Sequence, residues 1–231
     1  VKLNQEGYID FDIVLERSLK PLSITDFKSL SNDYKTVILD VRSQDHFRVG
    51  YVPGSIFIGL NGGFAPWVGA VIKDINTKIL LVCDKGMESQ AIMRLSRVGF
   101  DNVIGYLKGG FEIWKKSNQI IDSIDSILPT NLKEIINSKI SLIDVRSKNE
   151  RNKGYLKTSQ NIPLNIIDLN IERLDKSTSH YIHCAGGYRS MIAASILKRR
   201  GIHNLIDIKG GFGAIKQSGI VISDYVCPST L

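Results

Sequence analysis

The 231-residue sequence has only three cysteines and no long apolar run. Cys83, Cys184 and Cys227 show neither CxxC spacing nor accompanying histidine pairs, which argues against a disulfide framework or a zinc site, so no metal and no bound cofactor are expected. A membrane-spanning helix would need about 18 or more apolar residues in a row, and no secretory signal is visible. A sparse, odd set of thiols suits a reducing compartment, so we expect a cytoplasmic protein with no membrane partner.

Basic residues are in excess only in the second half of the chain. Residues 1–126 hold 15 Lys+Arg and 15 Asp+Glu, whereas residues 127–231 hold 15 and 8. Nucleic-acid binding calls for a basic stripe with stacking aromatic side chains. The longest basic run is residues 198–200, at the end of a predicted helix, where positive charge also favours the helix dipole. We therefore expect no nucleic-acid partner, and a small anionic substrate in the second half explains the charge asymmetry.

The chain contains a duplication with an offset of 101 to 104 residues. Three blocks of sequence recur: VILDVRS (37–43) as SLIDVRS (141–147), ILLVCDKGMES (79–89) as YIHCAGGYRS (181–190), and YLKGGF (106–111) as DIKGGF (207–212). A repeat of this length indicates a duplicated domain.

Each copy alternates short β-branched runs with segments of helical periodicity. The runs 36–39, 78–82 and 103–106, and their counterparts 140–143, 180–183 and 205–208, are predicted strands. Strands alternating with helices predict an α/β fold with a parallel sheet in each copy. The expected organisation is a leader or remnant of an upstream domain (1–20), copy one (21–119), a linker (120–128), copy two (129–223) and a C-terminal tail (224–231).

Cys184 is the candidate nucleophile. It lies between a predicted strand and a helix that starts near Arg189 or Ser190, with Ala185, Gly186, Gly187 and Tyr188 between them. Glycines let backbone amides turn toward the sulfur, and the helix N-terminus directs its free N–H groups at the same spot. Arg189 adds a positive charge that can hold an oxyanion through two hydrogen bonds. The pattern favours a reactive thiolate over the alternative of a buried, inert cysteine.

Together these motifs resemble the rhodanese superfamily. The Asp-Val-Arg blocks, the segment leading to Ile-Pro-Leu, Cys-x-x-Gly-x-Arg-Ser and Lys-Gly-Gly-Phe carry the resemblance, over about 200 residues. It implies two tandem domains, each a five-stranded parallel sheet flanked by helices. It also implies sulfurtransferase activity, in which Cys184 takes sulfane sulfur from thiosulfate or a low-molecular-weight persulfide and passes it to a thiol acceptor.

The resemblance also implies roles for single residues. The amides of residues 185–190 would stabilise a persulfide on Cys184, and Arg189 would steer an anionic donor. Asp144 and Arg146 are expected to form a structural salt bridge. Copy two departs from the usual loop, because residues 154–159 read GYLKTS where copy one has GYVPGS (50–55).

Copy one departs at the loop itself. Glu88 stands where copy two has Arg189, and Asp84 adds a second carboxylate beside Cys83. Two negative charges near a thiolate disfavour it and repel an anionic donor. Copy one is therefore predicted to be a degenerate, structural or partner-facing domain. Glu88 could instead point outward as a first-turn helix acid.

Four further interpretations concern the context of the chain, two alternative functions and Cys227. The leader resembles the junction in fusions of a metallo-β-lactamase-fold domain to tandem rhodanese domains, through NQEGY (4–8), Phe11-Asp12 and Pro21-Leu22. We therefore expect a longer protein with an upstream metal-dependent domain. A non-catalytic module that presents or senses persulfide is the alternative function. A cysteine phosphatase is a weaker alternative, because phosphatases have five residues between Cys and Arg and this chain has four. Cys227 is expected to be a free surface thiol.

Overall fold

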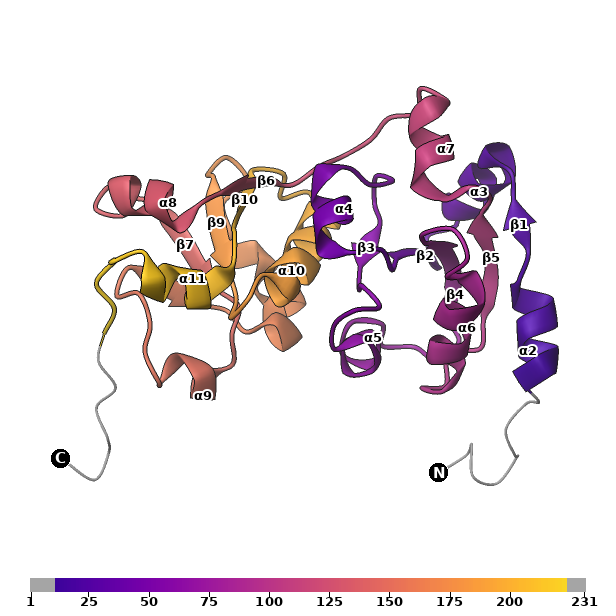
Figure 1. The fold of residues 1–231 in the computed structure, drawn as a ribbon, viewed down its shortest axis with the longest axis horizontal. Helices are drawn as coiled ribbons and strands as arrows, with labels where there is room; N and C mark the ends of the chain where they lie inside the picture. The colour runs from indigo at the N-terminus through magenta and orange to yellow at the C-terminus, as the bar shows by residue number, and fades with distance from the viewer. Residues whose placement is uncertain (1–10, 224–231) are drawn as a thin grey trace. The chain divides into compact units, whose positions relative to one another are not determined.

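The computed structural model describes residues 11–223, which form two compact units divided near residue 122. Each unit contains a five-stranded sheet in which every neighbouring pair of strands is parallel. Helices flank both sheets (Figure 1). The predicted α/β fold with two parallel five-stranded sheets is confirmed. None of the helices between residues 11 and 223 is long and apolar enough to cross a membrane.

The first unit has strand order β1-β5-β4-β2-β3. Its strands are β1 (Pro21–Leu22), β2 (Thr36–Asp40), β3 (Ile56–Phe57), β4 (Lys78–Val82) and β5 (Val103–Leu107). Its helices are α2 (Phe11–Ser18), α3 (Ile24–Ser31), α4 (Gln44–Val49), α5 (Phe64–Val71), α6 (Glu88–Ser96) and α7 (Gly110–Lys116). The central strands β2 and β4 are apolar at residues 37–39 and 79–82, as expected of a sheet whose two faces are covered.

The second unit repeats this order as β6-β10-β9-β7-β8. Its strands are β6 (Asp125–Ile127), β7 (Ser141–Asp144), β8 (Ser159–Asn161), β9 (His180–His183) and β10 (Leu205–Ile208). Its helices are α8 (Pro129–Ile135), α9 (Lys148–Arg151), the 3₁₀ helix η1 (Leu164–Arg173), α10 (Tyr188–Arg199) and α11 (Gly211–Gln217).

Helix α10 is the most enclosed helix of the second unit. Residues 190–197 are all buried, and the helix contacts η1, β9 and β10. A helix that is buried all round is held on several sides, so its N-terminus has a fixed position relative to the sheet. The helix begins at Tyr188, one residue before the predicted start.

Two segments that the sequence prediction placed outside the two copies, α2 and β6, belong to the folded units. Residues 125–127, assigned to a linker, form β6 and pair with β10. Residues 11–18, assigned to a leader outside both copies, form α2, which packs against α6 and β5 with Val14 buried. In each copy an edge strand, β1 or β6, pairs with the strand before the Lys-Gly-Gly-Phe motif. Cys227, predicted to be a surface thiol, lies outside the described residues.

Candidate active site around Cys184

Cys184 follows the last residue of β9 at the carboxyl edge of the sheet, where ligands of parallel α/β sheets bind. The residue is 1% exposed, and its Sγ accepts a hydrogen bond of 3.1 Å from the backbone amide of Gly187. Gly187 has φ of 104°, a value that L side chains rarely adopt, and this conformation turns its amide toward the sulfur. One of the predicted amide donors therefore contacts the thiol, and α10 starts at the next residue.

The other predicted loop residues take different positions. Ala185 and Gly186 are exposed, while Tyr188 and Arg189 are partly exposed. Ser190 is fully buried, and its Oγ lies 2.9 Å from the Gly187 carbonyl oxygen and 2.7 Å from Oδ1 of Asp207 on β10. The Ser190 hydroxyl thus links the loop to β10.

The Lys-Gly-Gly-Phe motif holds the other side of the loop. The amide of Phe212 donates to the Cys184 carbonyl oxygen at 2.7 Å, and the amide of Gly213 donates to the Ala185 oxygen at 3.0 Å. This close approach depends on Gly211, which has φ of 56° and whose added Cβ would lie 2.6 Å from the Cys184 oxygen. The motif was found as a repeat, but its role as a backbone clamp on Cys184 was not predicted.

Arg189 has a partner that the sequence did not reveal. Its Nη1 and Nη2 donate to Oε2 and Oε1 of Glu150, both at 2.6 Å. Glu150 belongs to α9 and also completes a capping box with Ser147. Hydrogen bonds from Arg189 and then from Ser147 outweigh partial burial and lower the pKa of Glu150 to about 2. The capping-box spacing Ser-x-x-Glu was readable in the sequence, but nothing in it pointed to Arg189.

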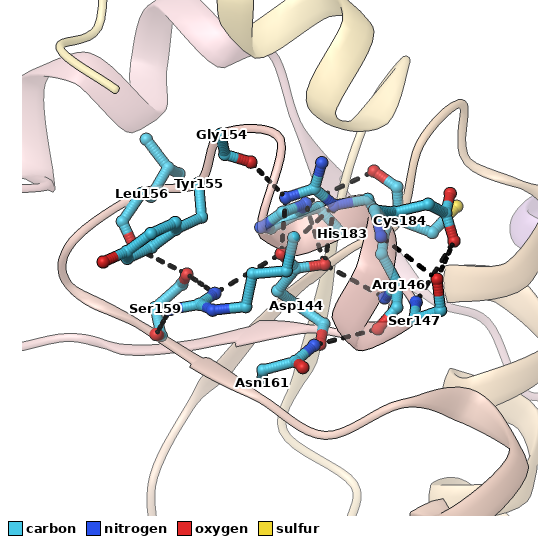
Figure 2. A network of polar contacts seen from close by, with 12 residues as sticks. Asp144, Arg146, Ser147, Gly154, Tyr155, Leu156, Ser159, Asn161, His183 and Cys184 are labelled. Atoms are coloured by element: carbon cyan, nitrogen blue, oxygen red, sulfur yellow. Dashed lines mark hydrogen bonds and ion pairs between the residues drawn. The ribbon is translucent and has the colours of Figure 1, made fainter. Parts of the chain in front are cut away.

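Asp144 and Arg146 form a buried ion pair below the loop (Figure 2). The guanidinium donates to both carboxylate oxygens, and its Nη2 also donates to the Gly154 carbonyl oxygen at 3.0 Å. Burial raises the pKa of Asp144, but the hydrogen bonds from Arg146 and the charges nearby outweigh it, so the net shift is downward. The predicted salt bridge is therefore present, and Arg146 also stacks on the Phe212 ring at 3.7 Å.

The altered segment 154–159 keeps the turn of copy one. The amide of Ser159 bonds to the Leu156 oxygen at 2.9 Å, as the amide of Ser55 bonds to the Val52 oxygen at 3.1 Å. In addition, Arg151 donates to both the hydroxyl and the carbonyl oxygen of Ser159. Loss of the Pro-Gly pair has therefore not removed the turn hydrogen bond, and Arg151 adds two bonds to it.

His183 immediately precedes Cys184 but is enclosed by the protein. Burial, partly offset by Asp144, lowers its pKa to about 4, and its ring stacks with Phe212. The imidazole is therefore neutral near pH 7. His180 bonds through Nδ1 to Ser141 Oγ and through Nε2 to the Asp175 carbonyl oxygen. Both histidines are therefore buried structural residues of β9.

The corresponding site in copy one places carboxylates around its cysteine. Burial raises the pKa of Cys83 to about 12, and the charges of Glu88, Asp40 and Asp84 add to that effect. Glu88 is the first residue of α6, so it does lie in the first helical turn as the alternative interpretation proposed. It is the largest of the carboxylate contributions, but burial is the larger cause.

A comparison with models of protein families identifies the family of this chain. The model for the rhodanese-like domain matches residues 23–117 and again residues 128–218. The chain belongs to the rhodanese-like family. Both matched ranges correspond to the two units of the fold.

The relatives align with a stretch of this chain about as long as one domain, and their sequence identity is low. The adenylyltransferase and sulfurtransferase uba4 of Pyricularia oryzae is 32% identical over 113 residues, covering 41% of this chain and only 22% of that protein. The thiosulfate sulfurtransferase GlpE of Pseudoalteromonas translucida is 31% identical over 99 residues, covering 42% of this chain and 90% of that protein. Among solved structures, SSP1007 of Staphylococcus saprophyticus is 30% identical with a TM-score of 0.39, covering 42% of this chain and 97% of that one.

Proposed function

We propose that the protein is a sulfurtransferase that carries sulfane sulfur as a persulfide on Cys184. The observation that supports this most is the position of the Cys184 sulfur. It accepts the Gly187 amide at 3.1 Å, directly before the N-terminus of a 12-residue helix. Amide donors and the positive end of a helix dipole stabilise negative charge, whether on a thiolate or on a persulfide. Relatives named as sulfurtransferases lend the proposal further support.

The proposed reaction has two displacements. In the first, the Cys184 thiolate attacks the outer sulfur of a donor, forming an S–S bond as the bond to the donor breaks, and the leaving group departs with the electron pair. In the second, an acceptor thiolate attacks the outer sulfur of the Cys184 persulfide and regenerates the cysteine thiolate. The oxidation state of the protein is the same before and after, so the cycle needs no cofactor in this chain.

Copy one is proposed to be a supporting domain rather than a second active site. The pKa of Cys83 is raised to about 12 by burial and by carboxylates, so the thiolate is scarce near pH 7. A persulfide-presenting or regulatory role, the alternative function, fits this copy better than copy two. Fusion to an upstream metallo-β-lactamase-fold domain and a cytoplasmic location stay predictions from the sequence.

Mass spectrometry of the intact chain tests the proposal directly. After treatment with thiosulfate or glutathione persulfide, we expect a gain of about 32 Da that peptide mapping assigns to Cys184. The adduct should be released by a thiol acceptor. Loading on Cys83, or no loading with any sulfane-sulfur donor, would contradict the proposal.

A further inference from the structure

The guanidinium of Arg189 is already occupied by an anion of the protein. Both terminal nitrogens donate to the Glu150 carboxylate at 2.6 Å, in a bidentate geometry. Arginine uses this same edge to hold carboxylates, phosphates and other oxyanions. An anionic group entering the Cys184 loop therefore competes with Glu150 for the two terminal nitrogens of Arg189.

Glu150 is also fixed from its own side. Its backbone amide donates to Ser147 Oγ at 3.2 Å, and its Oε2 accepts from the Ser147 amide at 3.1 Å and from Ser147 Oγ at 2.9 Å. Because these bonds and Arg189 lower the pKa of Glu150 to about 2, the carboxylate is ionised near pH 7. A fixed negative charge beside the loop repels a second anion.

Copy one shows that the fold does not require this ion pair. The position that corresponds to Glu150 holds His46, and the position that corresponds to Arg189 holds Glu88, so copy one has neither member of the pair. His46 instead approaches Asp84, with Nδ1 and Oδ1 3.6 Å apart. Copy one nevertheless forms the same five-stranded sheet, which points to a role for Glu150 and Arg189 in the site rather than in the fold.

We propose that Glu150 determines donor specificity by occupying Arg189, so that Cys184 accepts sulfur from low-molecular-weight persulfides in preference to thiosulfate. This inference rests on the proposed function of Cys184. Thiosulfate carries a sulfonate next to its sulfane sulfur, and that group needs a free cationic partner at the loop. A persulfide R–S–SH has no sulfonate there. The Cys184 thiolate attacks its outer sulfur, the S–S bond to R–S breaks, and R–S⁻ leaves with the electron pair.

The Glu150→Gln variant separates the charge of Glu150 from its structural role, because glutamine also serves in capping boxes. Steady-state transfer should be measured with thiosulfate and with glutathione persulfide. Freeing a charge-assisted contact should raise kcat/KM for thiosulfate about tenfold, mainly through KM, with a much smaller change for the persulfide. Unchanged thiosulfate use, or an equal fall with both donors, would overturn the proposal, since Glu150 would then only position Arg189.

Asp168→Asn is the matched control. Asp168 forms a second bidentate pair, with Arg200 at the C-terminal end of α10, where Nε and Nη2 each donate at 3.0 Å. The substitution removes the same charge from the same unit. The partner of Asp168, Arg200, lies about 16 Å along the helix from Arg189. Asp168→Asn should leave thiosulfate use unchanged. A rise equal to that of Glu150→Gln would overturn the proposal by showing a general charge effect.

A binding measurement distinguishes failure of the inference from failure of the proposed function. Sulfate is an inert oxyanion whose binding can be followed as protection of Cys184 from iodoacetamide. Glu150→Gln should strengthen this protection about tenfold, and equal protection in both proteins would overturn the inference. If protection differs but neither donor loads Cys184, Glu150 does limit anion binding at Arg189, and the sulfurtransferase proposal fails.

Discussion

Gly211 lies directly against the backbone of Cys184: a Cβ added to Gly211 would come within 2.6 Å of the Cys184 carbonyl oxygen. That distance is shorter than any real Cβ contact, and the φ of 56° at Gly211 disfavours every L side chain. The second glycine of the Lys-Gly-Gly-Phe motif therefore sets how closely α11 approaches the loop. The amide bonds from Phe212 and Gly213 to the loop depend on this approach.

Gly211→Ala is expected to lower stability and to displace the Cys184 loop. The backbone conformation alone costs about 1–2 kcal/mol, and the clash adds to it. Urea unfolding gives the stability, and the rate of Cys184 alkylation reports the loop. Gly213→Ala is the control, because its Cβ would meet the Ala185 oxygen at an ordinary 3.5 Å. Equal effects of the two substitutions would contradict this account of the motif.

Cys83 is predicted to react much more slowly than Cys184 with iodoacetamide between pH 6 and 9. The pKa of Cys83 is raised to about 12, first by burial and then by Glu88, and the thiolate is the reactive form. Glu88→Arg should accelerate alkylation of Cys83 only in part, because the burial persists. Cys83 reacting as fast as Cys184 at pH 7 would show that both copies are chemically competent.

The contribution of Glu150 to stability should disappear in acid. Its pKa falls from 4.5 to about 2 on folding, so the folded state favours the ionised form. The resulting stabilisation is complete above about pH 4.5 and is lost as the pH falls toward 2. Partial solvent exposure limits it to below about 1 kcal/mol. Urea midpoints of the wild type and Glu150→Gln should therefore differ at pH 6 and converge near pH 2; a difference that persists there would contradict the shift.

The sequence predicted those parts of the fold that repeat or show strong periodicity. The central strands were found because a parallel sheet covered on both faces requires continuous apolar runs. The edge strands β1, β3, β6 and β8 were missed, since they are only two or three residues long, and β6 begins with the polar pair Asp125–Ser126. Helix α2 was left outside copy one because residues 1–20 have no counterpart in copy two.

The site was predictable only where its residues are close together in the chain. The loop from Cys184 to Ser190 could be read as a strand–loop–helix junction, and Asp144 with Arg146 as an ion pair. The contacts of Glu150 with Arg189, and of Gly211 with Cys184, join residues 39 and 27 positions apart. Such contacts depend on the strand order, in which β7 and β10 lie on either side of β9, and a single sequence does not reveal them.

Sulfur transfer by the two single-cysteine variants, Cys184→Ser and Cys83→Ser, tests the central claim most directly. Each substitution removes one sulfur nucleophile with little change in volume, and circular dichroism would verify the fold. With glutathione persulfide as donor and a thiol as acceptor, Cys184→Ser should abolish turnover while Cys83→Ser retains the wild-type rate. Substantial turnover by Cys184→Ser, or its loss in Cys83→Ser, would contradict the assignment of the persulfide to Cys184.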